Sequence, residues 1–152
     1  MTHFELAMRF VGEVHEIPGE QHSPFIQWCL ECCGYGPEAP DEIPWCAAFV
    51  SRICWICRLP RSKSAAARSW LQVGTAKALP DAFIGDIVVL KRGQGAGQSG
   101  PDVLQAPGHV GFYAGREAGR VLILSGNQSD AVTVARFSVK DILGIRRVVL
   151  SI

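Results

Sequence analysis

The stretch Pro44-Trp45-Cys46-Ala47-Ala48-Phe49-Val50 sets one cysteine at the point where an apolar helical pattern begins. The residues up to Pro44 have the composition of a loop, and the helical pattern continues through Ile53 and Ile56. A thiol at a helix N-terminus lies near unpaired backbone N–H groups and the positive end of the helix dipole, and both favour the thiolate. Taken alone, a cysteine in such a place is more often a small core residue. Its interpretation as a nucleophile therefore depends on the rest of the chain.

The composition is that of one globular domain covering residues 1–152. The chain is 48% hydrophobic and 19% charged, which is enough apolar material for a core. A formal net charge of +1 gives no electrostatic reason to expect a nucleic-acid partner. No segment is long enough to cross a membrane, and nothing in the pattern favours an obligate dimer. We therefore expect a monomer that binds neither nucleic acid nor membrane.

The periodicity predicts helices first and strands second. Helices are expected at residues 3–15, 24–33, 46–58 and 64–71, and strands at 85–90, 109–114, 121–125, 131–137 and 145–150. The long glycine-containing loop at 93–107 is of a kind that is usually functional or mobile. Helices followed by an antiparallel meander predict an α+β fold, with the N-terminal helices packed on a sheet of about five strands.

The six cysteines admit a metal-binding alternative. Two CxxC pairs, Cys29 with Cys32 and Cys54 with Cys57, have nominally the spacing of a four-thiolate zinc site. Both pairs fall inside apolar helical patterns, where residues i and i+3 share a face. They are therefore better explained as small residues that fill gaps between helices, and we expect neither a metal nor another cofactor.

A cysteine nucleophile needs a base, and His109 is the best candidate among four histidines. It opens a predicted strand directly after Gly108, whereas the other three histidines lie near the start of the chain. A third residue has to orient the imidazole, and Asn127 lies at the end of the next strand, roughly opposite His109. Gln128 competes for this role because neighbouring strand residues point to opposite faces. Asn127 has a second interpretation as a turn residue, because asparagine tolerates turn conformations.

Five further residues are candidates for substrate binding, each with a structural alternative. Trp45 either walls the cleft or belongs to the core. Asp41 and Glu42 either bind a cationic substrate group or a metal ion, or are exposed loop charges. Gly108 either leaves room for substrate or forms a turn, and Gln128 is the remaining candidate. The oxyanion of an acyl intermediate would be held by the Cys46 backbone N–H and a second donor that the sequence does not identify.

Four short motifs, in this order, resemble the NlpC/P60 superfamily of cysteine peptidases, and most of all its CHAP-like branch of phage endolysins and peptidoglycan amidases. The motifs are Pro44 to Val50, Gly85-Asp86-Ile87-Val88-Val89, Gly108-His109-Val110-Gly111-Phe112 and Gly126-Asn127-Gln128-Ser129. The resemblance extends from about Val14 to Arg147 and implies a papain-like fold. It implies Cys46 as nucleophile and His109 as base. For the third position it leaves Ser125, Asn127 and Gln128, of which we select Asn127. Some CHAP domains bind calcium in an acidic loop before the cysteine, but Asp41 and Glu42 are too few to repeat that pattern.

The resemblance implies a peptidoglycan hydrolase that cleaves an amide bond through an acyl-enzyme. The sequence leaves open whether an inhibitor or immunity protein is a second kind of partner. The first ten residues lack the features of a secretory signal. We therefore expect synthesis in the cytoplasm and action on the cell wall after release or injection. Three alternatives stay open: a non-catalytic module that binds peptidoglycan, a cytosolic thiol amidase with another substrate, and a zinc-stabilised structural domain.

Overall fold

A computed structural model describes residues 1–19 and 21–150 of the chain. Three α-helices come first: α1 (His3–Met8), α2 (Pro24–Glu31) and α3 (Cys46–Ile56). A capping box between Thr2 and Glu5 starts α1, and the Ser23 hydroxyl accepts from the Ile26 N–H to start α2, with Pro24 at the first helical position. Local sequence signals therefore set where these two helices begin.

The first helix is shorter than the prediction of 3–15. It ends at Met8, and Gly12 adopts a φ of +81° that a helix cannot continue through. The chain then runs antiparallel beside the start of β5 (Ala131–Ser138), where His15 forms a bridge to Ala131 and the Val132 N–H donates to the Val14 carbonyl. Pairing with the sheet therefore replaces the predicted end of the helix.

The strands form one antiparallel sheet of six, which confirms the α+β class and adds one strand to the expected five. The spatial order is β1-β6-β2-β3-β4-β5, in which β1 spans Thr75–Lys77, β2 Ile87–Lys91, β3 Gly108–Glu117, β4 Arg120–Gln128 and β6 Ile142–Arg147. The three-residue edge strand β1 carries too little pattern to be predicted, and β6 begins three residues before the predicted 145. The predicted helix at 64–71 is a 3₁₀-helix over Ala67–Gln72.

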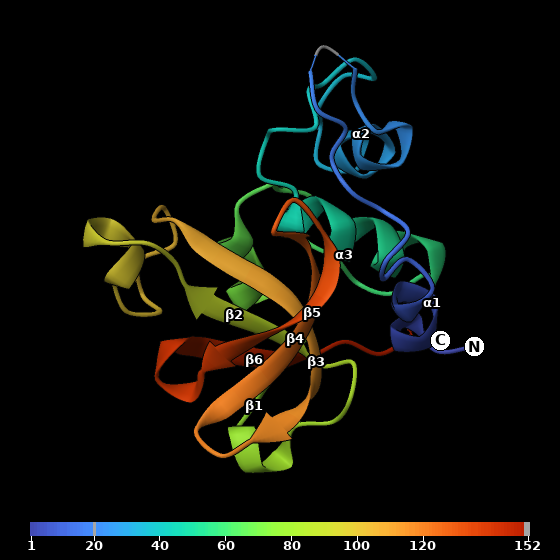
Figure 1. Ribbon diagram of the computed structural model, residues 1–152. Helices are drawn as coiled ribbons and strands as arrows, with labels where there is room; N and C mark the ends of the chain where they lie inside the picture. The colour runs from blue at the N-terminus through green and yellow to red at the C-terminus, as the bar shows by residue number, and fades with distance from the viewer. Residues whose placement is uncertain (20, 151–152) are drawn as a thin grey trace.

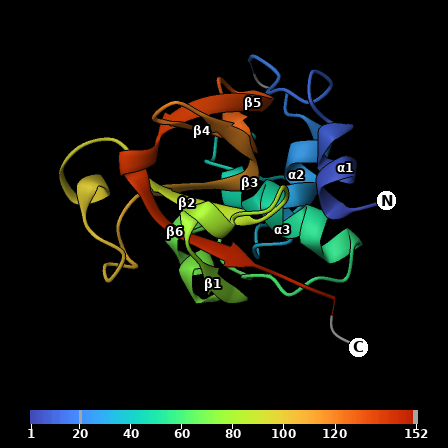
Figure 2. The ribbon, with the colours of Figure 1, turned by 90° about the horizontal axis from the view of Figure 1, so that it is seen from below.

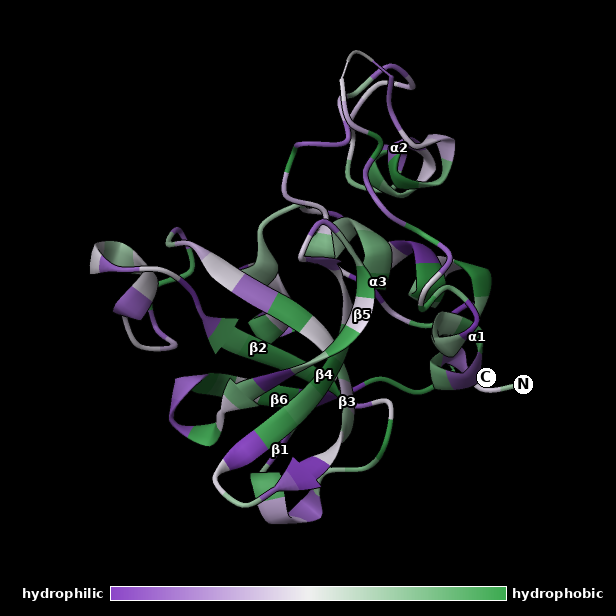
Figure 3. Cartoon of the chain, viewed as in Figure 1, coloured by the Kyte–Doolittle hydropathy of each residue, from purple (hydrophilic) through white to green (hydrophobic). Residues whose placement is uncertain are grey.

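The helices cover one face of the curved sheet, with α3 packed against β3 and β4 (Figures 1 and 2). Strand alternation divides the apolar residues between the two faces. Ile87 and Val89 join the core under the helices, whereas Val88 and Leu90 join a second cluster on the opposite face. Figure 3 shows β2 and much of β4 in the hydrophobic colour for this reason. Both faces of the central strands are buried, so the sheet is a rigid base for the loops at its ends.

In the part of the chain that the structure describes, no helix is both long enough and apolar enough to span a bilayer.

Candidate active site

Cys46 is the first residue of α3, as the sequence predicts. The residue before it, Trp45, provides no side-chain cap, so the first backbone N–H groups of the helix have no partner from that side chain. Cys46 is buried, with 3% of its surface exposed. Gly126 in β4 lies against the start of α3, where an added Cβ would collide with the Trp45 ring and approach the Phe49 Cβ at 3.1 Å. A residue without a side chain is therefore needed at position 126 for α3 to pack on the sheet.

His109 lies near the start of β3 and is held from two sides. Its ring stacks on Phe137 with centroids 5.2 Å apart, and its Nε2 lies 2.9 Å from Oε1 of Gln128. The Gln128 amide nitrogen donates to the Thr133 carbonyl at 2.8 Å, to the Thr133 hydroxyl at 3.0 Å and to the Ile123 carbonyl at 3.2 Å. These acceptors fix the amide so that its oxygen faces His109. Nε2 must then carry the proton, which leaves Nδ1 as the basic nitrogen of a neutral ring.

The selection of Asn127 as the orienting residue is wrong, because Gln128 occupies that position. The β3–β4 register pairs Phe112 with Leu124 and would carry on to set His109 opposite Asn127. However, Asn127 adopts a φ of 57° and the β4–β5 register shifts between Ser125 and Gln128. This local twist brings the Gln128 side chain to His109. Ser125, the other candidate, instead donates to the Val110 carbonyl at 2.6 Å.

The electrostatics of the pair favour a thiolate and an imidazolium. Burial alone would raise the pKa of Cys46, but hydrogen bonding and charge from His109, the Val110 N–H and the Arg92 charge together lower it below its ordinary 9.0. Burial would lower the pKa of His109, but the Cys46 thiolate and the Gln128 oxygen raise it above its ordinary 6.5. The two shifts have opposite signs, as expected for a nucleophile beside its base.

Of the five predicted substrate-binding residues, Trp45 and Asp41 have structural roles and Glu42 lies away from His109. Trp45 is 0% exposed and belongs to the core. Asp41 is also 0% exposed and accepts from the Ile17 and Ser23 backbone N–H groups at 2.9 and 2.8 Å, so it ties loops together. Glu42 is exposed, and it lines a small hollow that shares no residue with those beside His109.

Gly108 and Gln128 do lie at the site. Gly108 lines a hollow next to His109, but its missing side chain also makes room for Arg68, whose Cγ would lie 2.9 Å from an added Cβ. Gln128 lines the hollow on the other side of His109 and acts mainly through that histidine.

One group among the described residues approaches the geometry of a metal site. His22, Asp41 and Glu42 each place a ligand atom within 4.8 Å of the others. Nδ1 of His22 is already 3.2 Å from the Asp41 carboxylate, and both Asp41 oxygens have hydrogen-bond partners. The cluster is therefore explained as a set of hydrogen bonds that join two loops. Within the described residues, the four cysteines of the two CxxC pairs do not bring three ligand atoms together in this way.

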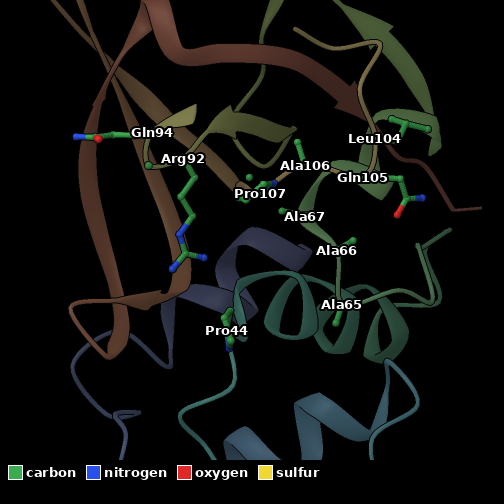
Figure 4. A pocket seen from close by; sticks show the side chains of 12 residues that line it. Pro44, Ala65, Ala66, Ala67, Arg92, Gln94, Leu104, Gln105, Ala106 and Pro107 are labelled. Atoms are coloured by element: carbon green, nitrogen blue, oxygen red, sulfur yellow. The ribbon is translucent and has the colours of Figure 1, made fainter. Parts of the chain in front are cut away.

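Three adjoining hollows form a groove that contains His109 and passes Pro44, two residues before Cys46. The largest, of about 600 Å³, lies between Pro44 and the 104–108 segment, and Figure 4 shows Ala65, Ala66 and Ala67 on its wall. The second, of about 430 Å³, contains His109 and Phe137 and shares Arg92 and Gly93 with the first. The third, of about 460 Å³, shares Ala65 and Ala66 with the first. Because the first hollow shares lining residues with each of the other two, the three together form one elongated, open groove with His109 near one end.

Arg68 is a functional residue that the sequence analysis missed. Its guanidinium is fully buried and donates to five loop carbonyls at 2.9–3.2 Å: Gly97, Ser99, Gly100, Val103 and Pro107. These hydrogen bonds fix the loop at 93–107, which leads directly into Gly108 and His109, to the rest of the domain. The available signal was an arginine between apolar residues in Ala67-Arg68-Ser69-Trp70, since a buried arginine must find several acceptors.

Comparison with known proteins finds no matching family model, no matching curated sequence and no matching solved structure. The candidate site is therefore defined by the geometry of this chain.

Proposed function

We propose that the protein is a cysteine amidase in which Cys46 is the nucleophile, His109 the general base and Gln128 the residue that positions His109. The observation that carries the proposal is the interaction between Cys46 and His109, which lowers the pKa of the thiol and raises that of the imidazole, while Gln128 holds Nε2 of the ring by a hydrogen bond. A purely structural cysteine in a core has its pKa raised by burial, as Cys29 and Cys54 do in this chain.

The reaction follows from these positions. The Cys46 thiolate attacks an amide carbonyl carbon, and the backbone N–H of Cys46 at the start of α3 is placed to stabilise the oxyanion. The His109 imidazolium gives its proton to the leaving amine, and the C–N bond breaks to leave a thioester on Cys46. Neutral His109 then takes a proton from water, whose oxygen attacks the thioester and releases a carboxylic acid. Thiolate and imidazolium are thereby restored.

For the substrate we propose an amide bond of peptidoglycan. The elongated groove suits an extended, peptide-like chain more than a compact small molecule. The ordered motifs around Cys46, His109 and Gln128 resemble those of NlpC/P60 and CHAP-like enzymes, and we propose that the protein shares their papain-like fold. On this proposal the protein acts in the cell wall after release or injection.

Mass spectrometry of muropeptides tests the proposal directly. Purified peptidoglycan is incubated with wild type, with Cys46→Ala and with Cys57→Ala, a control that removes a half-buried cysteine at the other end of α3. We expect new fragments from wild type and Cys57→Ala alone, and their masses identify the bond that is cut. Fragments from a folded Cys46→Ala would refute the nucleophile. Failure of all three to cut several wall chemistries, together with retention on insoluble peptidoglycan, would favour the non-catalytic binding module.

A further inference from the structure

The hollow that contains His109 has basic walls. Lys91, Arg92 and Arg136 line it, and no aspartate or glutamate does within the described residues. Arg136 is already paired with Glu117, with Nε–Oε2 and Nη2–Oε1 distances of 2.8 and 3.2 Å. Lys91 and Arg92 form no ion pair with the described chain. Two unpaired cations therefore border the hollow, although the net charge of the protein is only +1.

The backbone holds these two cations in place. Lys91 is the last residue of β2, paired with Gly108 of β3. The N–H of Arg92 donates to the Gly97 carbonyl at 3.1 Å, and the same carbonyl accepts from Nη2 of the buried Arg68 at 3.0 Å. The exposed Arg92 side chain therefore extends from a backbone position that is held by this hydrogen bond. Figure 4 shows it reaching across the groove toward Pro44, next to the start of α3.

The position of Arg92 links the cation to the reacting groups. Arg92 lines both the hollow that contains His109 and the hollow beside Pro44, and its charge acts on Cys46 and on His109. A planar guanidinium with a nearby ammonium is suited to a carboxylate, which accepts two parallel hydrogen bonds from arginine. Neutral peptide groups offer no comparable partner for two unpaired charges.

We propose that Lys91 and Arg92 form a carboxylate-binding subsite, which selects amide substrates that carry a free carboxylate close to the scissile bond. This inference rests on the proposed amidase function and adds a substrate class to it. A charge-assisted hydrogen bond of this kind is expected to change discrimination between acid and amide by about 10- to 100-fold.

Alkylation of Cys46 tests the subsite without any knowledge of the substrate. Iodoacetate and iodoacetamide both react by attack of the thiolate on carbon, with formation of the S–C bond and loss of iodide. They differ in that only iodoacetate has a carboxylate. The ratio of the two rates, measured on the Cys46 peptide by mass spectrometry, therefore reports attraction of an anion and cancels changes in thiolate content.

We expect the iodoacetate-to-iodoacetamide ratio to fall about 10-fold or more in Lys91→Gln/Arg92→Gln. The control Arg120→Gln removes an exposed charge at the opposite end of β4 from Gln128, and its ratio should equal that of wild type. An unchanged ratio in the double variant would overturn the subsite.

Binding measurements test the carboxylate-binding subsite independently of whether the protein cleaves peptidoglycan. Folded Cys46→Ala is titrated with a soluble peptidoglycan peptide and with the same peptide after its carboxylates have been converted to amides. Tighter binding of the acid form, lost in the triple variant with Lys91→Gln and Arg92→Gln, supports the subsite. Equal affinity for the two forms contradicts it, even if wild type cuts peptidoglycan. A lowered alkylation ratio without any cleavage would uphold the anion site and refute only the proposed substrate.

Discussion

Replacing Gln128 by methionine should disable His109 while the volume of the side chain is kept. The change removes the oxygen that accepts from Nε2 of His109 at 2.9 Å. A hydrogen bond to a charged partner contributes about 1.5–3 kcal/mol, so loss of this stabilisation of the imidazolium corresponds to about 10- to 150-fold in rate. The pKa of His109 should fall and that of Cys46 should rise, because each stabilises the charged form of the other.

The assay is the pH dependence of iodoacetamide alkylation at Cys46, followed on the isolated peptide. Burial raises the pKa of Cys33 to about 11, so at pH 6 this neighbouring thiol should stay unmodified while Cys46 reacts. Gln128→Met should slow the reaction at pH 6 by the stated factor. Asn127→Gly is the matched control, because glycine keeps the φ of 57° and removes only the side chain. The argument fails if Asn127→Gly reproduces the loss or Gln128→Met keeps the profile of wild type.

Three further changes test the supports of the site. Arg68→Met removes the guanidinium that donates to five loop carbonyls, of which only those of Gly97 and Gly100 also accept from a backbone N–H. We expect about 3 kcal/mol of lost stability in urea unfolding with faster amide exchange over residues 93–107, whereas amide protection equal to wild type would show that the loop keeps its structure without Arg68. Gly126→Ala sets a methyl group against the Trp45 ring, which should lower the free energy of unfolding by about 1–3 kcal/mol; an unchanged melting temperature would contradict this close approach. Burial of the carboxyl, with a smaller contribution from a hydrogen bond to Asp130, raises the pKa of Glu16 from its ordinary 4.5 to about 7. The folded state therefore favours the protonated carboxyl. This contribution is complete below pH 4.5 and is lost as the pH rises through about 7. Because the carboxyl is partly accessible, we expect on the order of 1 kcal/mol, measured as the difference between wild type and Glu16→Gln at pH 4.5 and 7.5; parallel pH curves for the two proteins would exclude it.

Interpretation from the sequence worked where a signal is local. The Ser23-Pro24 pair determines the start of α2, and the unbroken apolar run Ile87-Val88-Val89-Leu90 indicates a strand that is buried on both faces. The position of Cys46 at the beginning of α3 follows from the same kind of signal, because the loop composition before it changes to an apolar helical period after it. These features depend on neighbours in the chain, and the neighbours are visible in the sequence.

Only the tertiary structure decided which groups meet. Extrapolation of the strand register would set Asn127 opposite His109, but the left-handed backbone at Asn127 shifts the register and brings Gln128 there instead. Trp45 and Asp41 resemble cleft residues in the sequence, yet packing on Gly126 and two backbone donors bury them. The sequence around Arg68 indicates a buried arginine, but it does not show that the acceptors lie in a loop about thirty residues later. The chemistry of each residue was therefore determined by the sequence, whereas its partners were determined by backbone twist and burial, which depend on the whole fold.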